Sequence, residues 1–586
     1  MTQYYDSMAD RYRSESAQLK KRYDTYSLFR VLLALTVIFT AWWAIRSGQW
    51  IYALLPLLAA GLFVGCVKKH RAIQWQRRLS VNLLNINREE AAFLLRKENA
   101  NYDGTRYIDS THFYTYDLDI FGKDSLFHYL NRTTTYVGEM KLAESLSRSF
   151  SPEEALSRQE AIRELSADPE RRQHITARGR MMPDSEAEYQ KLVAWSENRD
   201  NEVSRAATTL SFLLPALFIG ATAGYITGIW SWKWILAAFV GNLVLTGTQL
   251  AKIRGELAGF KNVADIIRHY GLILTAIEAG PFRSAGLVKL QEELGGQAGP
   301  ELARLSRLFL KLQGINFDLG ALVLNGTLTY HIHALRALLQ WKQAHAARLH
   351  RWLEVMGETD ALSSYANFAW NNPGYAYPVL HARPELRFED MGHPLINEQA
   401  RVNNTIHLTP VNFMILTGSN MSGKSTFLRA IGVNMVLAGA GAPVCAVKAQ
   451  AGLLPVLVSM RQSDSLSSGE SYFFAEVKRL KAIMDQLEKE PCLVLLDEIL
   501  RGTNSNDKQS GTIGVIKKII AHTATGGIAT HDLAVCRLAE EYPDRLENRN
   551  FEVEIINDEL VFDYKLREGV CRNKSATFLM EKMGII

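Results

Sequence analysis

Four long apolar runs stand out in the N-terminal half of the 586-residue chain. Val31 to Ile45 and Ile51 to Val67 contain no charged residue, and a short polar turn separates them. Ala206 to Trp232 is free of charge over 27 positions, and the apolar run Trp234 to Ala251 follows it closely. A membrane-spanning helix needs about 20 predominantly apolar residues. The runs therefore predict two transmembrane helical hairpins, separated by a long polar segment.

Residues that flank these runs predict how the hairpins are oriented. Basic residues follow each hairpin, at Lys68 to Arg71 and at Lys252 and Arg254. Tryptophans gather near the two turns: Trp42, Trp43, Trp50, Trp230, Trp232 and Trp234. Positive charge favours the cytoplasmic side, and tryptophan favours the membrane–water interface. This bias puts both ends of the chain in the cytoplasm, as expected of a multi-pass protein of the inner (cytoplasmic) membrane.

Apolar residues at helical spacing continue after the second hairpin. The stretch from Glu301 to Leu353 predicts long, lever-like helices, with apolar positions at Leu305, Leu308, Leu312, Leu335, Leu339 and Trp352. Basic residues of the same stretch are candidates for contact with nucleic acid, although a solvated helix face is the simpler interpretation: Arg336, Lys342, Arg348 and Arg351.

From residue 385 onward the pattern changes to short apolar runs, which are typical of buried strands in a parallel sheet. Phe413 to Leu416, Cys492 to Leu496 and Gly527 to Thr530 are such runs. The expected fold is an α/β domain with a parallel-rich sheet, preceded by an all-α core and lever region and two transmembrane hairpins. The predicted segments are a cytoplasmic N-terminus (1–27), hairpin 1 (28–67), a first core part (68–205), hairpin 2 (206–251), a core and lever region (252–384) and the α/β domain (385–586).

The run Gly418 to Ser425 carries the strongest chemical signal. Its letters GSNMSGKS fit the phosphate-binding loop G-x-x-x-x-G-K-[ST], between a predicted strand and a predicted helix. Glycines let backbone amides turn toward phosphate groups, and the helix N-terminus adds partial positive charge. Lys424 is expected to reach the β- and γ-phosphates of ATP, and Ser425 to hold Mg²⁺. The predicted nucleotide-binding residues are Gly418, Ser419, Asn420, Met421, Ser422, Gly423, Lys424, Ser425 and Thr426.

Two acidic residues after the second predicted strand suggest a hydrolytic site. Asp497 and Glu498 follow the apolar run CLVLL, in the arrangement called Walker B. Asp497 is expected to position Mg²⁺ together with Ser425, and Glu498 to polarise the water that attacks the γ-phosphate. His531 follows the third predicted strand and is expected to donate a hydrogen bond to the γ-phosphate. Glu498 and His531 are the predicted catalytic residues.

The segment DSLSSGESYFFAEVKRLK lies between these motifs and carries a Ser-Gly pair, Ser468 and Gly469, at the start of a predicted helix. Such a pair offers a hydroxyl and free amides to a phosphate. On its own the pair is an ordinary helix cap. Beside the other motifs it resembles the signature loop of the ABC-type ATPases, which in that superfamily completes the nucleotide site of the opposite subunit.

The segments TGSNMSGKSTFLR, DSLSSGESYFFAE, LLDEILRGTNSND and ATHD, in this order, resemble the ATPase domain of the MutS family of DNA mismatch repair proteins. The RGT in the third segment distinguishes the MutS family from transporter ATPases of the ABC type, which do not usually carry these residues after Walker B. The similarity starts near Gly392-His393-Pro394, and weaker similarity to the MutS core covers Leu126 to Arg172 and Asp360 to Trp370. The resemblance implies an ATP hydrolase that forms a dimer and acts on DNA.

One feature of the family is missing. MutS proteins that detect mismatches carry an N-terminal domain with a Phe-x-Glu motif, whose aromatic ring stacks on the mispaired base. Here this spacing occurs only at Phe474 to Glu476, inside the signature region. Direct reading of mismatches is therefore not expected.

Composition changes this picture little. A formal net charge of +5 is too mild to predict nucleic-acid binding by itself. The five cysteines form no C-x-x-C pair, and no histidine cluster lies at ligand spacing, so neither zinc nor a disulfide framework is expected: Cys66, Cys445, Cys492, Cys536 and Cys571.

The sequence leaves three functions open. The first is a membrane-anchored MutS-like ATPase that couples hydrolysis to its grip on DNA, in repair or recombination. The second is an ATP-driven transporter or membrane-remodelling machine; against it, the hairpins hold no ionisable residue that would mark a substrate path. The third is a nucleotide-switched membrane scaffold that does not contact DNA.

Overall fold

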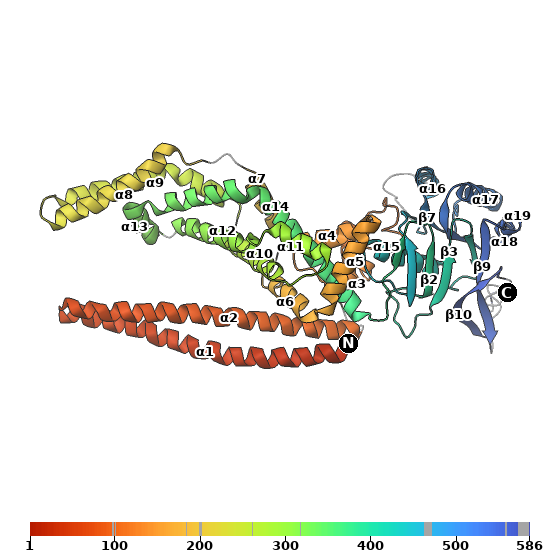
Figure 1. Ribbon diagram of the computed structural model, residues 1–586, viewed down its shortest axis with the longest axis horizontal. Coiled ribbons are helices and arrows are strands. Elements are labelled where there is room, and N and C mark those ends of the chain that lie inside the picture. The colour runs from red at the N-terminus through yellow and green to blue at the C-terminus, as the bar shows by residue number, and fades with distance from the viewer. Residues whose placement is uncertain are drawn as a thin grey trace.

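The computed structural model is elongated, and it describes residues 1–95, 99, 101–182, 184–198, 202–260, 262–316, 318–461, 472–556, 559–571 and 585. Two helical arms extend in the same direction from a central helical body (Figure 1). An α/β domain lies at the opposite end of the body. The N-terminus lies where the first arm meets the body.

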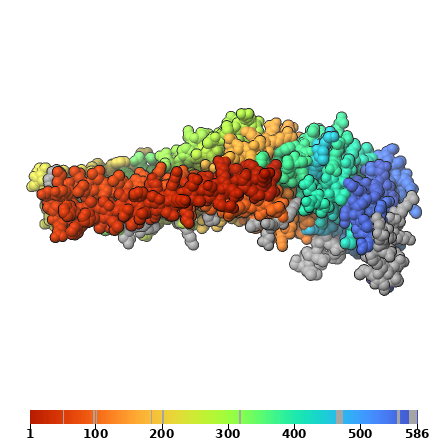
Figure 2. Space-filling model, turned by 90° about the horizontal axis from the view of Figure 1, so that it is seen from below, coloured from red at the N-terminus to blue at the C-terminus, as the bar shows by residue number. Residues whose placement is uncertain are grey.

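The first arm is an antiparallel hairpin of two long helices, α1 (Thr2–Ser47) and α2 (Leu54–Leu94), joined through the short 3-10 helix η1 (Trp50–Ala53). Seen from below, it forms a continuous ridge along the molecule (Figure 2). Ile38 and Leu57, in its outer half, are 66% and 68% exposed. Both helices extend well beyond the predicted hairpin at 28–67, because their polar inner halves remain helical and reach the body.

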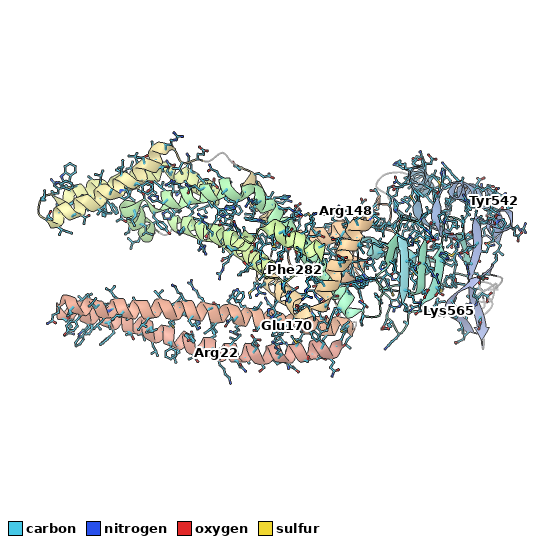
Figure 3. The ribbon with its side chains drawn as sticks, viewed as in Figure 1. Arg22, Arg148, Glu170, Phe282, Tyr542 and Lys565 are labelled. Carbon is cyan, nitrogen blue, oxygen red and sulfur yellow. The ribbon has the colours of Figure 1, made fainter. Side chains whose placement is uncertain are left out.

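Polar contacts hold the inner end of this arm on the body. The Tyr12 hydroxyl donates to Glu170 (3.5 Å), and Arg11 forms an ion pair with the same carboxylate (3.2 Å). Glu170 is labelled in Figure 3, where the first arm meets the body. The buried Glu90 of α2 accepts hydrogen bonds from the amides of Asn367 (3.1 Å) and Asn371 (3.0 Å). The arm is therefore held by an exposed ion pair at Glu170 and by buried, paired polar groups at Glu90.

The first helices of the body, α3 to α7, each begin at a residue whose side chain caps the helix. Ser151 and Glu154 form a capping box at the start of α5, with Pro152 at the first helical position. The helices and short 3-10 turns of the body are η2 (Thr105–Tyr107), α3 (Leu126–Leu130), α4 (Tyr136–Ser147), α5 (Pro152–Ala167), α6 (Pro169–Gly179), α7 (Glu186–Glu197), α10 (Val263–Glu278), α11 (Ala285–Leu294), α12 (Ala298–Gln313), η3 (Gly314–Asn316), α13 (Asp318–Leu328) and α14 (Tyr330–Asn371).

The second arm is the hairpin of α8 (Arg205–Ile226) and α9 (Trp232–Leu257), with α13 packed against α9. Leu217 and Val244 on its surface are 60% and 63% exposed. Among the described residues, four helices are long and apolar enough to cross a membrane: α1, α2, α8 and α9. Their apolar outer parts lie at the same end of the molecule (Figure 1).

The α/β domain contains two sheets. The larger has the strand order β10-β9-β4-β8-β7-β6, in which every pair is parallel except β10 with β9. The smaller has the order β1-β5-β2-β3. The strands are β1 (Val379–His381), β2 (Leu386–Met391), β3 (Asn404–Leu408), β4 (Phe413–Gly418), β5 (Lys448–Gly452), β6 (Val456–Ser459), β7 (Cys492–Asp497), β8 (Ala524–Ala529), β9 (Leu546–Ile556) and β10 (Glu559–Glu568), and the helices are α15 (Lys424–Gly439), α16 (Tyr472–Leu487), α17 (Ser505–Ala521), α18 (Leu533–Cys536) and α19 (Leu538–Glu541).

The predicted fold class is confirmed in its outline, a helix-rich N-terminal region followed by an α/β domain with a parallel-rich sheet. The predicted lever stretch contains the helices α12, α13 and α14. One feature differs from the prediction. The smaller sheet was not predicted, because its strands are short and half-exposed and come from distant parts of the sequence.

A buried aspartate of α14 anchors the start of α4. The Asp360 carboxylate accepts hydrogen bonds from the backbone N–H groups of Thr134 (2.9 Å) and Thr135 (3.0 Å) and from the Thr135 hydroxyl (2.9 Å). Burial raises the pKa of Asp360 to about 6. These contacts join residues more than 200 positions apart in the sequence.

We expect Asp360→Ala to destabilise the protein by about 3 kcal/mol, because it leaves buried donors without an acceptor. The matched control is Asp168→Ala, at the half-exposed cap of α6, where its carboxylate accepts from the N–H of Arg171 (3.0 Å). That change should cost about 1 kcal/mol. Thermal unfolding in detergent compares the two; equal melting temperatures would contradict the anchoring role of Asp360.

Candidate functional site

Three neighbouring strands bring the predicted site residues together. β4 pairs with β8, and β8 pairs with β7, all in parallel. Their carboxyl ends therefore lie at one edge of the sheet, which is where ligands bind in open α/β sheets. The glycine-rich loop follows β4, His531 follows β8, and Glu498 follows β7. Because β8 lies in the middle, His531 stands between the loop and the acidic residue.

The glycine-rich loop makes a tight turn from β4 into α15. All six residues of β4 are buried, and Gly423 caps α15. Gly423 has a φ of 100°, and a Cβ at this position would lie 3.1 Å from the Tyr564 ring. Glycine is thus required here for both backbone conformation and space. Met421, at the tip of the loop, is 80% exposed.

The Lys424 ammonium group is buried inside this loop. Its Nζ donates to the carbonyl oxygens of Gly418 and Ser419, both at 2.9 Å, and lies 3.4 Å from Nε2 of His531. Burial lowers the pKa of Lys424, while the acidic residues after β7 oppose that shift. The Lys424 ammonium is partly desolvated, and its hydrogen-bond partners are neutral carbonyls that do not cancel its charge. It can therefore bind an anion favourably.

Two hydroxyl groups of the loop support the same conclusion. The Oγ atoms of Ser419 and Ser422 are buried and have no hydrogen-bond partner among the described residues. Buried polar groups normally have a partner. Free amides at a helix N-terminus, a buried ammonium and unpaired hydroxyls together fit a phosphate group. The loop therefore fits a nucleoside triphosphate such as ATP.

Glu498 is held in a strained position by two donors. It has a φ of 47°, and its carboxylate lies 2.7 Å from Nε2 of His531 and 3.2 Å from Nε of Arg501. The hydrogen bond from His531 lowers the pKa of Glu498 to about 2, against the effect of burial and with help from Arg501. At neutral pH this carboxylate is ionised, so it is a good hydrogen-bond acceptor and a weak base.

The two residues predicted to hold Mg²⁺ line different cavities. Ser425, with Asn420 and Thr426, lines a cavity of about 460 Å³ that also contains Glu498. Asp497 is buried at the end of β7 and lines a neighbouring cavity of about 310 Å³. Hydroxyl and carboxylate oxygens are ligands that Mg²⁺ prefers. In this structure, therefore, Glu498 rather than Asp497 shares a cavity with Ser425.

The larger cavity has further lining residues that the sequence motifs did not identify. His393 and Arg401 come from the connection between β2 and β3, and Tyr564 comes from β10. Burial, helped by Arg429 and Arg401, lowers the pKa of His393 to about 4. Aromatic faces beside a phosphate loop suit a nucleobase. The one signal in the sequence was Gly392-His393-Pro394, noted only as the start of a resemblance.

Two aspartates of the body also reach the α/β domain and were not predicted. The buried Asp117 accepts hydrogen bonds from the N–H groups of Met460 and Arg461, both at 2.8 Å. Asp119 forms ion pairs with Arg461 and, at 3.3 Å, with Arg429 of α15. They connect the helix after the phosphate loop with the end of β6. No sequence pattern indicates these contacts, because residues 109–121 form turns without regular periodicity.

The predicted signature residues, Ser468 and Gly469, lie outside the described residues. The helix α16, which begins shortly after them, is described. Its Glu476 accepts a hydrogen bond of 2.6 Å from the N–H of Leu500, in the loop after β7. A direct contact therefore links the helix after the signature segment with the segment that carries Glu498.

A strand, a glycine-rich loop and a helix at the edge of a parallel sheet define the C-terminal part as a P-loop domain. Residues 414–584 match the family model described as MutS domain V. The resemblance predicted from the motifs is thereby confirmed: residues 414–584 are similar to MutS domain V.

Individual relatives agree with this assignment. The chain is 31% identical over 235 residues to the DNA mismatch repair protein MutS of Methanococcoides burtonii, which covers 39% of this chain and 26% of that protein. It is 32% identical over 232 residues to MutS of Desulfatibacillum aliphaticivorans, covering 38% and 26%. It is 29% identical over 242 residues to human MutS protein homolog 4, covering 39% and 25%. The matched part thus spans about a quarter of the length of these relatives.

The lowered pKa of His393 predicts a pH effect on stability. Its pKa of about 4 lies below the usual value of 6.5, so the unfolded chain binds an extra proton between these values. Stability is therefore lost as the pH falls from 6.5 to 4, by up to about 3 kcal/mol. His393→Gln should flatten this part of the melting temperature profile, whereas His350→Gln, at an exposed position of α14, should not. Parallel profiles for all three proteins would contradict the prediction.

Proposed function

We propose that this protein is a membrane-anchored MutS-type ATPase, which binds and hydrolyses ATP with Mg²⁺ as a homodimer and couples that cycle to DNA binding. The observation that carries the proposal is the P-loop cavity. It combines the buried Lys424 ammonium, the unpaired hydroxyls of Ser419 and Ser422, and the Glu498–His531 pair.

The residues of the loop divide the work of binding. Backbone amides of Gly418 to Thr426 and the Lys424 ammonium neutralise the phosphates, and binding there gives the two serine hydroxyls their missing partner. Ser425 holds Mg²⁺, with carboxylate oxygen supplied by Asp497 or Glu498. Mg²⁺ supplies charge neutralisation at the β- and γ-phosphates.

Hydrolysis needs Glu498 to exchange partners. Its carboxylate is occupied by His531 and Arg501, so it can align a water molecule only after at least one donor has turned away. His531 stands beside Lys424 as well, and donation to a γ-phosphate oxygen instead of Glu498 frees the carboxylate. His531 would then couple binding of the γ-phosphate to the release of Glu498, the residue that positions the attacking water.

The dimer and DNA parts of the proposal rest on the family. By the resemblance, Ser468 and Gly469 of one subunit complete the nucleotide site of the other. Relatives of the P-loop domain are named as DNA mismatch repair proteins. We therefore propose a role in DNA repair or recombination. The alternatives of a transporter or a DNA-independent scaffold have no comparable support.

Membrane anchoring rests on the four apolar helices α1, α2, α8 and α9. With basic residues after each hairpin, both arms enter the bilayer from the cytoplasmic side. We propose the inner membrane as the location, with the body and the P-loop domain in the cytoplasm. The segments 28–67 and 206–251 are the proposed membrane hairpins, and 1–27, 68–205, 252–384 and 385–586 are the proposed cytoplasmic parts.

Lys424→Ala should weaken ATP binding by about 100-fold, because a charge-assisted contact to the phosphates is lost. Glu498→Gln should retain binding but slow hydrolysis about 100-fold, because the amide is a poorer acceptor for the attacking water. Lys448→Ala, at an exposed lysine of the same domain, is the control and should change neither. Nucleotide titration and phosphate release measure the two effects; normal turnover by Glu498→Gln would remove that residue from catalysis.

DNA should stimulate the ATPase rate of the purified protein in detergent, with little preference for a mismatched duplex. The sequence Phe-x-Glu occurs only on α16 of the P-loop domain, and phosphate contacts alone bind all duplexes alike. Rates are compared with homoduplex, G·T and branched DNA at fixed ionic strength. A tenfold preference for G·T, about 1.4 kcal/mol, would contradict the lack of mismatch reading. A rate that no DNA changes would favour the scaffold alternative.

A further inference from the structure

The helix α13 presents an apolar surface where the body meets the second arm. It joins the ends of α12 and α14 on the side from which the arm extends (Figure 1). Leu319 to Leu328 is an apolar helix too short to span a bilayer. Its large exposed side chains are Leu319 (76% exposed), Leu322, Val323, Leu324 and Leu328. A contiguous apolar surface of this kind marks an interaction site.

Two amide side chains beneath this surface are hydrogen-bonded within the protein. Oδ1 of the buried Asn325 accepts hydrogen bonds from the backbone N–H of His331 (3.0 Å) and lies 2.9 Å from its Nδ1. The Asn242 amide of α9 donates to the carbonyl oxygen of Gly326 (2.9 Å). These two hydrogen bonds satisfy the carbonyl of Gly326 and the N–H of His331 beneath the apolar outer face, as contact with lipid requires of backbone groups.

Contacts with the second arm place α13 within its apolar span. Thr329, directly after α13, donates through its hydroxyl to the carbonyl oxygen of Ser211 (2.9 Å). Ser211 lies five residues, or about 8 Å, inside the charge-free run that begins at Ala206. Gly326 packs so closely on α9 that a side chain there would collide with Phe239. The surface of α13 is therefore continuous with the apolar surface of the arm.

Charged residues bracket this region. Lys311 at the end of α12 and Arg336 on α14 flank it, and Asp318 is the one charged residue of the sequence between them. The Arg336 guanidinium lies over the Phe212 ring, 5.8 Å from its centroid. Basic residues at the edges of an apolar segment suit the cytoplasmic headgroup region.

We propose that α13 is a membrane-inserted helix, which lies in the cytoplasmic leaflet beside the second arm and contacts lipid acyl chains. The proposal rests on the membrane anchoring proposed above and extends it. It turns the second arm into a three-helix membrane element and puts the start of α14 at the bilayer. No helix of spanning length is needed, because α13 enters and leaves on the same side.

The test uses a fluorophore that is quenched by bromine on lipid acyl chains. In a Cys66→Ser background, in which the other four cysteines are buried, single cysteines are introduced at three exposed leucines. Leu319→Cys probes α13, Leu217→Cys probes the middle of α8, and Leu156→Cys on α5 is the cytoplasmic control. The labelled full-length proteins are placed in phosphatidylethanolamine–phosphatidylglycerol vesicles with and without brominated acyl chains.

We expect Leu319→Cys and Leu217→Cys to lose fluorescence to a similar extent in brominated vesicles, and Leu156→Cys to lose none. Quenching at Leu217 without quenching at Leu319 would overturn the proposal for α13 alone. Absence of quenching at both would overturn membrane anchoring itself. Oxidative cross-linking of Leu319→Cys between two chains, without quenching, would show that a second copy covers α13 and would also overturn the proposal.

Discussion

The burial of α14 is the constraint on which the rest of the structure depends. This 42-residue helix is buried over most of its length and extends roughly 63 Å, at 1.5 Å per residue. At its start, Thr329 and His333 contact the second arm. In its last turns, the amides of Asn367 and Asn371 donate hydrogen bonds to Glu90 of the first arm. Both arms therefore take their positions from this one helix.

A second constraint acts at the sheet edge, where partial burial strengthens the electrostatic interactions between charged groups. The Lys424 ammonium, the His531 ring and the Glu498 carboxylate form a chain of contacts across three strands. In this chain His531 is the group that contacts both Lys424 and Glu498. A bound anion beside Lys424 would therefore compete with Glu498 for the hydrogen bond from His531.

Short sequence motifs predicted those site residues that directly follow a strand. The phosphate loop, the acidic pair and His531 were found because each follows a short buried strand, and parallel pairing then fixes where they meet. The roles of Asp117, Asp119 and His393 were missed, because each depends on contacts between distant segments without a periodic pattern. The helix α13 was missed for a different reason. Its apolar stretch, Leu319 to Leu328, is too short for a spanning helix and fits equally well as part of a lever.

The contacts at the two ends of α14 connect the phosphate-loop helix with the second arm. In a stiff helix, a displacement at one end appears at the other, unless the helix bends or slides past its neighbours. The C-terminal half of α14 lies against α4 and α5, and Arg158 of α5 donates to the carbonyl oxygen of Ala440, directly after α15. A shift of the phosphate-loop helix therefore reaches α14 through a single layer of helices. At the N-terminal end of α14, Thr329 and His333 contact the carbonyl oxygen of Ser211 in α8. The second arm therefore resists the same shift. These contacts form one continuous path from the helix after the phosphate loop, through α5 and α14, to the second arm.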